Sequence, residues 1–197
     1  PTYNITGLAS GSYGITVTDN FGSTATSSAT ILYLPVTNTT DNPDTYYATI
    51  QAAINAADPG EVITVCAGTY NENVNVTQAV TLTGAGSGSN PATNTVLTPS
   101  SSCSGVGFTI SAANVTIQNM YVTNYQDAVL LTGVANPTIN NMALVDYCRY
   151  GVSFGGSNSS VQILQTNIQR TSVLANTIGI RVGTANAVNG LLINNSS

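Results

Sequence analysis

The chain has 197 residues, which is enough for one repeat domain and a small second module, and only 6% of them are charged. Three Arg stand against eight acidic residues, Lys and His are absent, and the formal net charge is −5. Proteins bind nucleic acids and anionic membrane surfaces through Lys and Arg, so this composition excludes both kinds of partner. Without His or a Cys-x-x-Cys pair, we expect no metal site and no cofactor.

Thr, Ser, Asn and Gly must cover most of the surface, which is typical of secreted repeat proteins and of cell-surface stalks. No run of 18 apolar residues is present, so we expect no membrane insertion. The first residues show no basic segment followed by an apolar one, and we expect any export signal to lie outside this chain. The composition therefore predicts a protein that is secreted or displayed on the cell surface.

The first part of the chain alternates between apolar and polar side chains. Tyr13, Ile15 and Val17 share one face of a strand, residues 19–22 have the composition of a turn, and a second strand follows over residues 24–31. The alternation predicts a β-hairpin. A hairpin alone buries too little surface to be stable in water, so we expect the chain to begin partway through a domain.

Residues 7–22 follow the pattern Leu-x-x-Gly-x-Tyr-x-x-x-Val-x-Asp-x-x-Gly. This stretch resembles the end of the short Ig-like repeats in gliding-motility and surface adhesins of Bacteroidota, with Ser23 where those repeats often have Cys. The resemblance implies that residues 1–33 are part of an Ig-like β-sandwich module.

Residues 34–44 carry two prolines and a polar run, which predicts an extended linker before a second domain over residues 45–197. Residues 49–57 place Ile and Ala side chains at positions i, i+3, i+4 and i+7. This spacing predicts a short amphipathic helix that ends at residues 58–60 and lies on an apolar surface.

Internal repetition follows. Short β-branched runs at residues 62–65, 74–76 and 80–82 are separated by Gly and Asn turns. Four similar strands then begin at residues 107, 128, 151 and 179, which are 21, 23 and 28 residues apart. A second series of strands runs beside them at residues 115–120, 137–142 and 161–164. Periods of about 20 to 30 residues with several short strands and no helix predict a parallel β-helix, whose coils stack about 4.8 Å apart.

The stretch from Tyr47 to Val74 contains the elements Ile-Gln-x-Ala-Ile and Gly-x-Tyr-x-Glu-x-Val. It resembles the entry of pectin-lyase-like right-handed β-helices, in which a helix caps the solenoid and the second element begins the first coil. The resemblance implies an all-β fold, a right-handed parallel β-helix over residues 45–197 with an N-terminal capping helix. It implies fold more firmly than activity, because this superfamily holds lyases, hydrolases, adhesins and structural shafts.

The charged residues of the later coils do not form a recognisable catalytic site. Lyases of the resembled fold use clustered acids and a basic residue, and hydrolases use several Asp. Here an offset of 23 residues places Asp127 beneath Tyr150 and Asp146 above Thr123, so the two carboxylates lie in different columns. We therefore expect no enzyme, and we interpret Asp127, Asp146 and Arg149 as forming a local surface ion pair worth under about 1 kcal/mol and not a catalytic group.

Four tyrosines in two neighbouring coils are the candidate carbohydrate-binding site, because aromatic rings stack on sugars: Tyr121, Tyr125, Tyr147 and Tyr150. The alternative is that these rings pack against the edge of the solenoid with their hydroxyls in water. Asn119 and Asn141 occupy equivalent turns, where stacked Asn side chains serve a structural role. Among the three cysteines, we expect a disulfide between Cys66 and Cys103, with Cys148 free.

The sequence therefore predicts a non-enzymatic, extracellular structural or adhesive segment of a modular cell-surface or filament-forming protein. Two alternatives remain: a carbohydrate-binding module, and a fragment of a polysaccharide lyase or hydrolase whose catalytic coils lie outside this chain. The expected partners are other copies, neighbouring domains of a longer chain, or glycans. We also expect that neither end of the chain is a natural end and that the β-helix continues beyond it.

Overall fold

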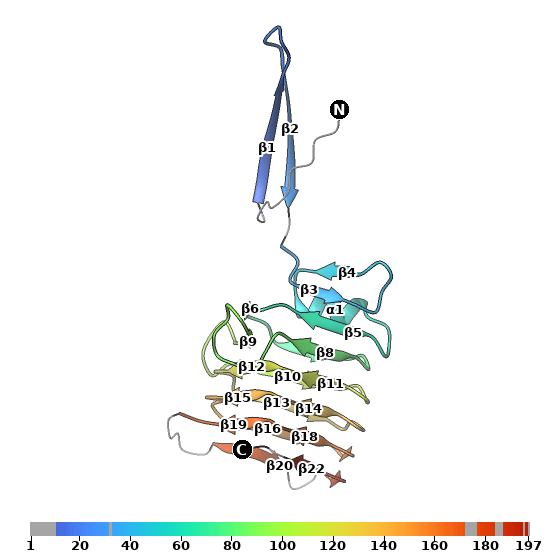
Figure 1. The fold of residues 1–197 in the computed structure, drawn as a ribbon. Coiled ribbons are helices and arrows are strands. Elements are labelled where there is room, and N and C mark those ends of the chain that lie inside the picture. The colour runs from blue at the N-terminus through green and yellow to red at the C-terminus, as the bar shows by residue number, and fades with distance from the viewer. Residues whose placement is uncertain (1–10, 32, 172–176, 184–186, 195, 197) are drawn as a thin grey trace. The chain divides into compact units, whose positions relative to one another are not determined.

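The computed structural model describes residues 11–31, 33–171, 177–183, 187–194 and 196. The chain forms two compact units, Pro1–Leu34 and Pro35–Ser197, and its secondary structure is almost entirely β (Figure 1).

The described part of the first unit is an antiparallel hairpin of β1 (Gly11–Thr18) and β2 (Thr24–Ile31). The turn is held by the Asp19 carboxylate, whose Oδ1 accepts hydrogen bonds of 2.8 Å from the backbone N–H groups of Phe21 and Ser23. Gly22 has a φ of 84°, which favours glycine. The predicted hairpin is confirmed, whereas the Ig-like sandwich stays a prediction.

The described residues of the second unit form three larger sheets, and the chain visits them in a fixed cyclic order. Sheet I has the strand order β4-β3-β5-β8-β11-β14-β18-β22, sheet II β6-β9-β12-β15-β19, and sheet III β7-β10-β13-β16-β20; a short parallel pair, β17 and β21, lies apart. The bounds in sheet I are β3 Val36–Asn38, β4 Thr45–Tyr47, β5 Val62–Val65, β8 Thr81–Gly84, β11 Thr116–Gln118, β14 Thr138–Asn140, β18 Gln162–Leu164 and β22 Leu192–Asn194. The bounds in sheet II are β6 Gly68–Tyr70, β9 Thr95–Leu97, β12 Met120–Thr123, β15 Ala143–Val145 and β19 Asn167–Gln169. Those in sheet III are β7 Val74–Val76, β10 Val106–Ile110, β13 Asp127–Thr132, β16 Tyr150–Gly155 and β20 Ile178–Val182, and the short pair is β17 Asn158–Ser159 and β21 Val188–Asn189.

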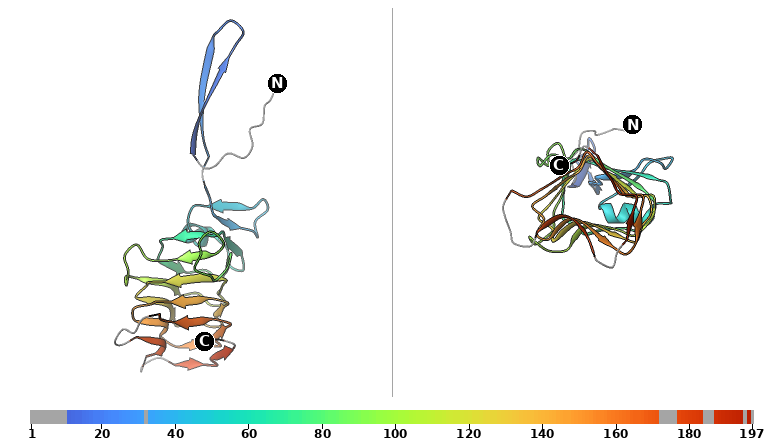
Figure 2. Two further views of the ribbon diagram at one scale, coloured as in Figure 1. Left: turned by 60° about the vertical axis from the view of Figure 1, so that its left-hand side comes forward. Right: turned by 90° about the horizontal axis from the view of Figure 1, so that it is seen from below.

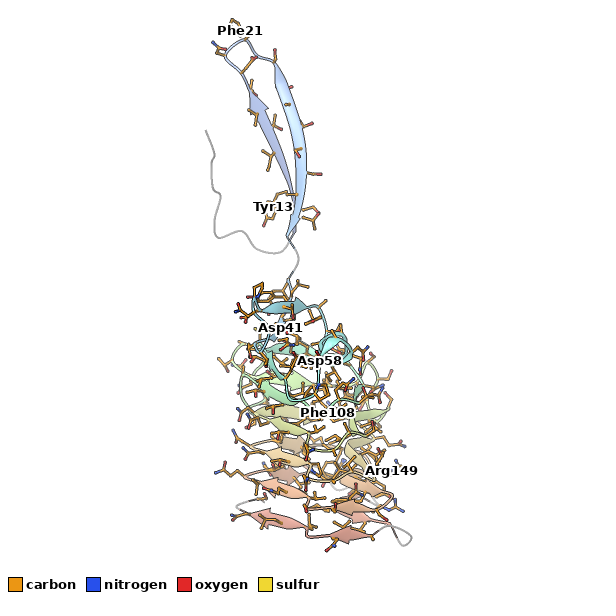
Figure 3. The ribbon with its side chains drawn as sticks, turned by 90° about the vertical axis from the view of Figure 1, so that its right-hand side faces the viewer. Tyr13, Phe21, Asp41, Asp58, Phe108 and Arg149 are labelled. Carbon is orange, nitrogen blue, oxygen red and sulfur yellow. A yellow bond between two sulfur atoms is a disulfide. The ribbon has the colours of Figure 1, made fainter. Side chains whose placement is uncertain are left out.

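From β5 to β18 every strand pairs in parallel with the strand of the same sheet one circuit later, so that successive circuits superpose when viewed along the stack (Figure 2). Apolar side chains consequently stack in columns that fill the interior, such as Phe108, which is fully buried (Figure 3). In sheet I one such column consists of Ile63, Leu82, Ile117, Ile139 and Ile163. The corresponding column in sheet II is Tyr70, Leu97, Val122 and Leu144. In sheet III it is Val74, Phe108, Val129 and Val152. The all-β, parallel-sheet prediction is confirmed, and the topology is compatible with the predicted parallel β-helix.

The predicted linker over residues 34–44 is wrong. The second unit begins at Pro35, and β3 pairs antiparallel with both β5 and β4. Val36 is fully buried, because its strand supplies the hydrogen-bond partners that the outer edge of β5 needs. The two prolines do not interrupt this strand, since Pro35 precedes it and Pro43 lies between β3 and β4.

Helix α1 (Ile50–Ala56) lies close to its predicted position and contacts β3, β4, β5 and β7. Thr49 is the N-cap residue, and its hydroxyl accepts a hydrogen bond of 3.1 Å from the Ala52 N–H. The Glu72 carboxylate accepts hydrogen bonds of 3.0 Å from the N–H groups of Ile50 and Gln51, which satisfies two more donors of the first turn. The apolar stripe is buried, as its spacing predicts.

Asparagine corners join the sheets. Asn114, Asn119, Asn136 and Asn141 have φ values between 46° and 59°, a left-handed conformation that Asn tolerates. Each donates its backbone N–H to a carbonyl of the following circuit. The side-chain amides of Asn141 and Asn119 also join across circuits at 2.8 Å, so the predicted structural role of this pair is confirmed.

Candidate functional site

Two of the four tyrosines proposed to bind carbohydrate lie in the interior. Tyr125 is fully buried and Tyr147 is 5% exposed. Glycines make room for them, because a Cβ atom on Gly107 would lie 3.3 Å from the Tyr125 ring and one on Gly151 would lie 3.1 Å from the Tyr147 ring. The Tyr125 hydroxyl donates a hydrogen bond to the Glu72 carbonyl. The prediction of a four-tyrosine sugar platform is therefore wrong for these two residues.

Burial governs the titration of both interior tyrosines. It raises the pKa of Tyr125, with a smaller contribution in the same direction from the Glu72 carboxylate. Burial also raises the pKa of Tyr147, against an opposing effect of Arg170, whose guanidinium carbon lies 5.9 Å from the centre of the ring. Both hydroxyls therefore stay neutral well above neutral pH.

The other two tyrosines are half-buried and lie on different sheets. Tyr121 belongs to β12 of sheet II, next to Val96 and Ala143 in register, and Tyr150 begins β16 of sheet III. The guanidinium carbons of Arg149 and Arg181 each lie 4.9 Å from the centre of the Tyr150 ring. This ring is thus already stacked against two cations. The structure does not bring the four tyrosines together on one surface.

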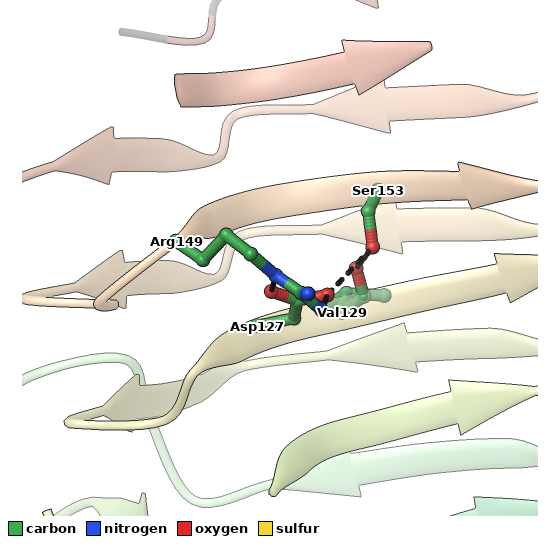
Figure 4. A network of polar contacts seen from close by, with 4 residues as sticks. All are labelled: Asp127, Val129, Arg149 and Ser153. Atoms are coloured by element: carbon green, nitrogen blue, oxygen red, sulfur yellow. Dashed lines mark hydrogen bonds and ion pairs between the residues drawn. The ribbon is translucent and has the colours of Figure 1, made fainter. Parts of the chain in front are cut away.

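Asp127 and Arg149 form a bidentate ion pair (Figure 4). Asp127 Oδ1 accepts from Arg149 Nε, and Oδ2 accepts from Nη2, both at 2.8 Å, while the Ser153 hydroxyl donates to Oδ2 at 3.2 Å. The pair is not the exposed one predicted, because the Asp127 side chain is 3% exposed while that of Arg149 is 46% exposed. The hydrogen bond with Asp127 raises the pKa of Arg149. Buried carboxylates require such partners.

The sequence signal for the contact between Asp127 and Arg149 was their separation of 22 residues, because this is close to the length of one circuit. The predicted alignment of Asp127 with Tyr150 is confirmed. Asp146 aligns one position away from the prediction, since Val145 lies beside Thr123. Its Oδ1 accepts 2.8 Å hydrogen bonds from the N–H and the hydroxyl of Thr171.

Each of the two later acids is therefore engaged by its own partners, one on sheet III and one at the corner between sheets II and III. This arrangement lacks the paired carboxylates that general acid–base chemistry uses. Within the described residues, no three His, Cys, Asp or Glu side chains come together in a way that could hold a metal ion. No helix in the described part is long and apolar enough to cross a membrane.

The disulfide joins Cys103 to Cys148, and Cys66 is an exposed free thiol, so the predicted Cys66–Cys103 bridge is wrong. The physical reason is the stacking of corners. Cys103 donates its N–H to the Asn124 carbonyl and Cys148 donates to the Tyr125 carbonyl, which places both beside the same corner between sheets II and III. Cys66 lies at the corner between sheets I and II, where its N–H donates to the Pro35 carbonyl.

The last described circuit is open. An apolar hollow of about 250 Å³ is lined by Ile168, Gly179, Ile180, Ile193 and Ser196. Ile193 continues the interior column of sheet I, yet it is 47% exposed. Interior positions are thus accessible at this end of the described stack.

Comparisons with protein-family models, with curated proteins and with solved structures found no match.

Proposed function

We propose that the second unit is a right-handed parallel β-helix that serves as an extracellular structural or adhesive segment of a modular surface or filament-forming protein. The observation that carries this proposal is the unbroken parallel stacking from β5 to β22, which builds an elongated stack from short strands. Such solenoids present long, repetitive faces and gain stability from each neighbouring coil. In this proposal α1 is the cap of the first coil, and the first unit is part of an Ig-like module.

The polar groups support a structural role rather than a catalytic one. The side chains of Glu72, Asp127 and Asp146 each accept hydrogen bonds from neighbouring coils or from α1. Asparagines at the corners bond to each other across coils. Carboxylates that hold the fold in this way are not available to a substrate without disturbing the stack.

An extracellular location is supported by the Cys103–Cys148 disulfide, because disulfides persist in oxidising compartments. The scarcity of charged residues is also typical of secreted repeat proteins. We propose self-association or contact with neighbouring domains, since the apolar side chains of Ile178, Val182 and Leu192 are 46 to 49% exposed.

The experiment has two parts. Antibody labelling and protease treatment of intact source cells should find the protein outside the cell. The purified chain, incubated with pectate or alginate with and without calcium, should release neither unsaturated nor reducing ends. A protein confined to the cytoplasm would contradict the proposed location, and turnover of either polysaccharide would contradict the structural role.

A further inference from the structure

The tripeptide pattern Asn-x-Ser/Thr occurs at several points of the chain. The structure separates the asparagines that begin these patterns into two groups. This pattern is the acceptor sequence for N-linked glycans in exported proteins. A glycan is attached to Nδ2, so a usable acceptor in the folded protein needs an exposed side chain whose Nδ2 is not committed elsewhere. The fully described patterns begin at Asn38, Asn75, Asn114 and Asn158.

Two of these asparagines are committed to the fold. Asn38 is 1% exposed, and its Nδ2 donates to the Glu61 carboxylate at 2.6 Å. Asn158 is 2% exposed, its Oδ1 accepts from the Val134 N–H at 2.9 Å, and its Nδ2 donates to the Gly156 carbonyl at 3.1 Å. A glycan on either would break these bonds and open the interior.

The other two are exposed and uncommitted at Nδ2. Asn75 lies on β7 between the buried Val74 and Val76, and only its backbone groups are hydrogen-bonded, by Gln51. Asn114 lies at a corner with a φ of 58°, and its side chain is exposed. Its Oδ1 accepts from Asn136 Nδ2 at 2.9 Å, and its own Nδ2 makes no hydrogen bond with another described residue.

We propose that Asn75 and Asn114 are N-glycosylation sites and that Asn38 and Asn158 are not. In this reaction Nδ2 of the asparagine forms a bond to C1 of a sugar carried on a lipid diphosphate. The bond between C1 and the phosphate oxygen breaks, the lipid diphosphate leaves, and the amide proton passes to a base of the transferase. The inference rests on the proposed export of the chain.

The two sites lie on neighbouring parts of one side of the stack. Asn75 is in β7, beside Thr109 of β10, and Asn114 follows β10 at the next corner. Glycans at both positions would cover the first circuits of sheet III. They would add hydrophilic surface to a chain in which only 6% of residues are charged.

Asn136 provides an internal comparison for Asn114. Asn136 has the same corner position one circuit later, a φ of 55° and an exposed side chain, and Thr138 stands two residues after it. Pro137 lies between them, and proline at that position excludes N-glycosylation. Asn114 and Asn136 thus share the local backbone conformation, but Asn136 lacks the acceptor pattern and its Nδ2 already donates to Asn114 Oδ1.

The test is glycopeptide mass spectrometry on the full protein isolated from the exterior of its source cells, compared with the Asn75→Gln and Asn114→Gln variants. We expect glycan on the peptides containing Asn75 and Asn114, none on those containing Asn38, Asn136 or Asn158, and the loss of one glycan mass in each variant. An exported protein with bare Asn75 and Asn114, or with glycan on Asn38 or Asn158, would overturn this inference and leave the proposed function standing. A protein found only in the cytoplasm would contradict both.

Discussion

The side-chain carboxamide of Gln51 pairs with both backbone groups of Asn75. Its Oε1 accepts from the Asn75 N–H at 2.7 Å and its Nε2 donates to the Asn75 carbonyl at 3.1 Å. A neighbouring strand would make the same two bonds, so one side chain of α1 satisfies part of the outer edge of β7. The Gln51 side chain thus takes the place of a strand partner for Asn75.

We expect Gln51→Ala to lower the free energy of unfolding by about 1 to 3 kcal/mol, because two backbone groups of β7 lose their partner. Gln51→Glu keeps an acceptor but no donor, so it should also destabilise the protein. Gln162→Ala is the matched control on an exposed strand position, and it should change the stability by less than about 0.5 kcal/mol. Urea unfolding measures all three variants. Equal stabilities for Gln51→Ala and Gln162→Ala would show that the Gln51 bonds contribute nothing.

The disulfide yields the second prediction. Cys103 and Cys148 are 45 residues apart, and chain-entropy arguments give about 4 kcal/mol for a loop of this length. We expect Cys103→Ser and Cys148→Ser each to lower the unfolding free energy by an amount of this order, and Cys66→Ser to leave it nearly unchanged. Non-reducing peptide mapping should recover the Cys103–Cys148 pair in Cys66→Ser. A mapped bridge to Cys66 in the unaltered protein would contradict this assignment.

The interior columns of stacked apolar residues show how much of the fold could be predicted from the sequence. The regular recurrence of apolar residues identified the strands and placed Asp127 beside Tyr150, because the offset between stacked residues is the number of residues in one circuit. The same approach failed for β3. A three-residue strand flanked by prolines has a weak local signal, and its pairing depends on β5, a strand some 25 residues away in the chain.

The site was less predictable, because offsets along the chain do not tell which way a side chain points at a corner. Tyr125 and Tyr147 lie at corners, where small residues such as Gly107 and Gly151 admit the rings to the interior. The disulfide was missed for a related reason. A loop between β9 and β10 returns Cys103 to the corner that Cys148 also approaches, and the length of a loop does not show which corner it will reach.

Arg149 and Arg181 permit a comparison of two kinds of cation contact at one ring. Both guanidiniums lie 4.9 Å from the centre of Tyr150, but only Arg149 is paired with the buried Asp127 carboxylate. Arg149→Ala should therefore cost about 1 to 3 kcal/mol, because it removes the strongest partner of a buried carboxylate, whereas Arg181→Ala should cost about 0.5 to 1 kcal/mol. Denaturant titrations of the two variants give the comparison.

A double-mutant cycle isolates the ion pair. Asp127→Asn combined with Arg149→Ala should cost less than the sum of the two single changes, with a coupling of about 0.5 to 3 kcal/mol. Additive costs would mean that the bidentate contact carries no net energy.

The last prediction concerns alkaline pH. The unfolded chain has a tyrosine pKa of about 10, while burial and the Glu72 carboxylate raise the pKa of Tyr125 in the folded protein. Above pH 10 the unfolded chain therefore loses its tyrosine proton while the folded chain keeps it. The contribution of Tyr125 to stability is fully present below pH 10 and is lost as the pH rises further, at up to about 1.4 kcal/mol per pH unit.

Tyr125→Phe should lower stability by about 1 kcal/mol at pH 8, because it removes the hydrogen bond to the Glu72 carbonyl, and should flatten the decline above pH 10. Tyr46→Phe is the control, since Tyr46 is 56% exposed, and it should keep the slope of the parent protein. Unfolding free energies between pH 8 and about pH 11, measured in a Cys66→Ser background to prevent disulfide exchange, provide the test. Parallel slopes for the parent and Tyr125→Phe would contradict this prediction. They would mean that Tyr125 ionises in the folded protein as readily as in the unfolded chain.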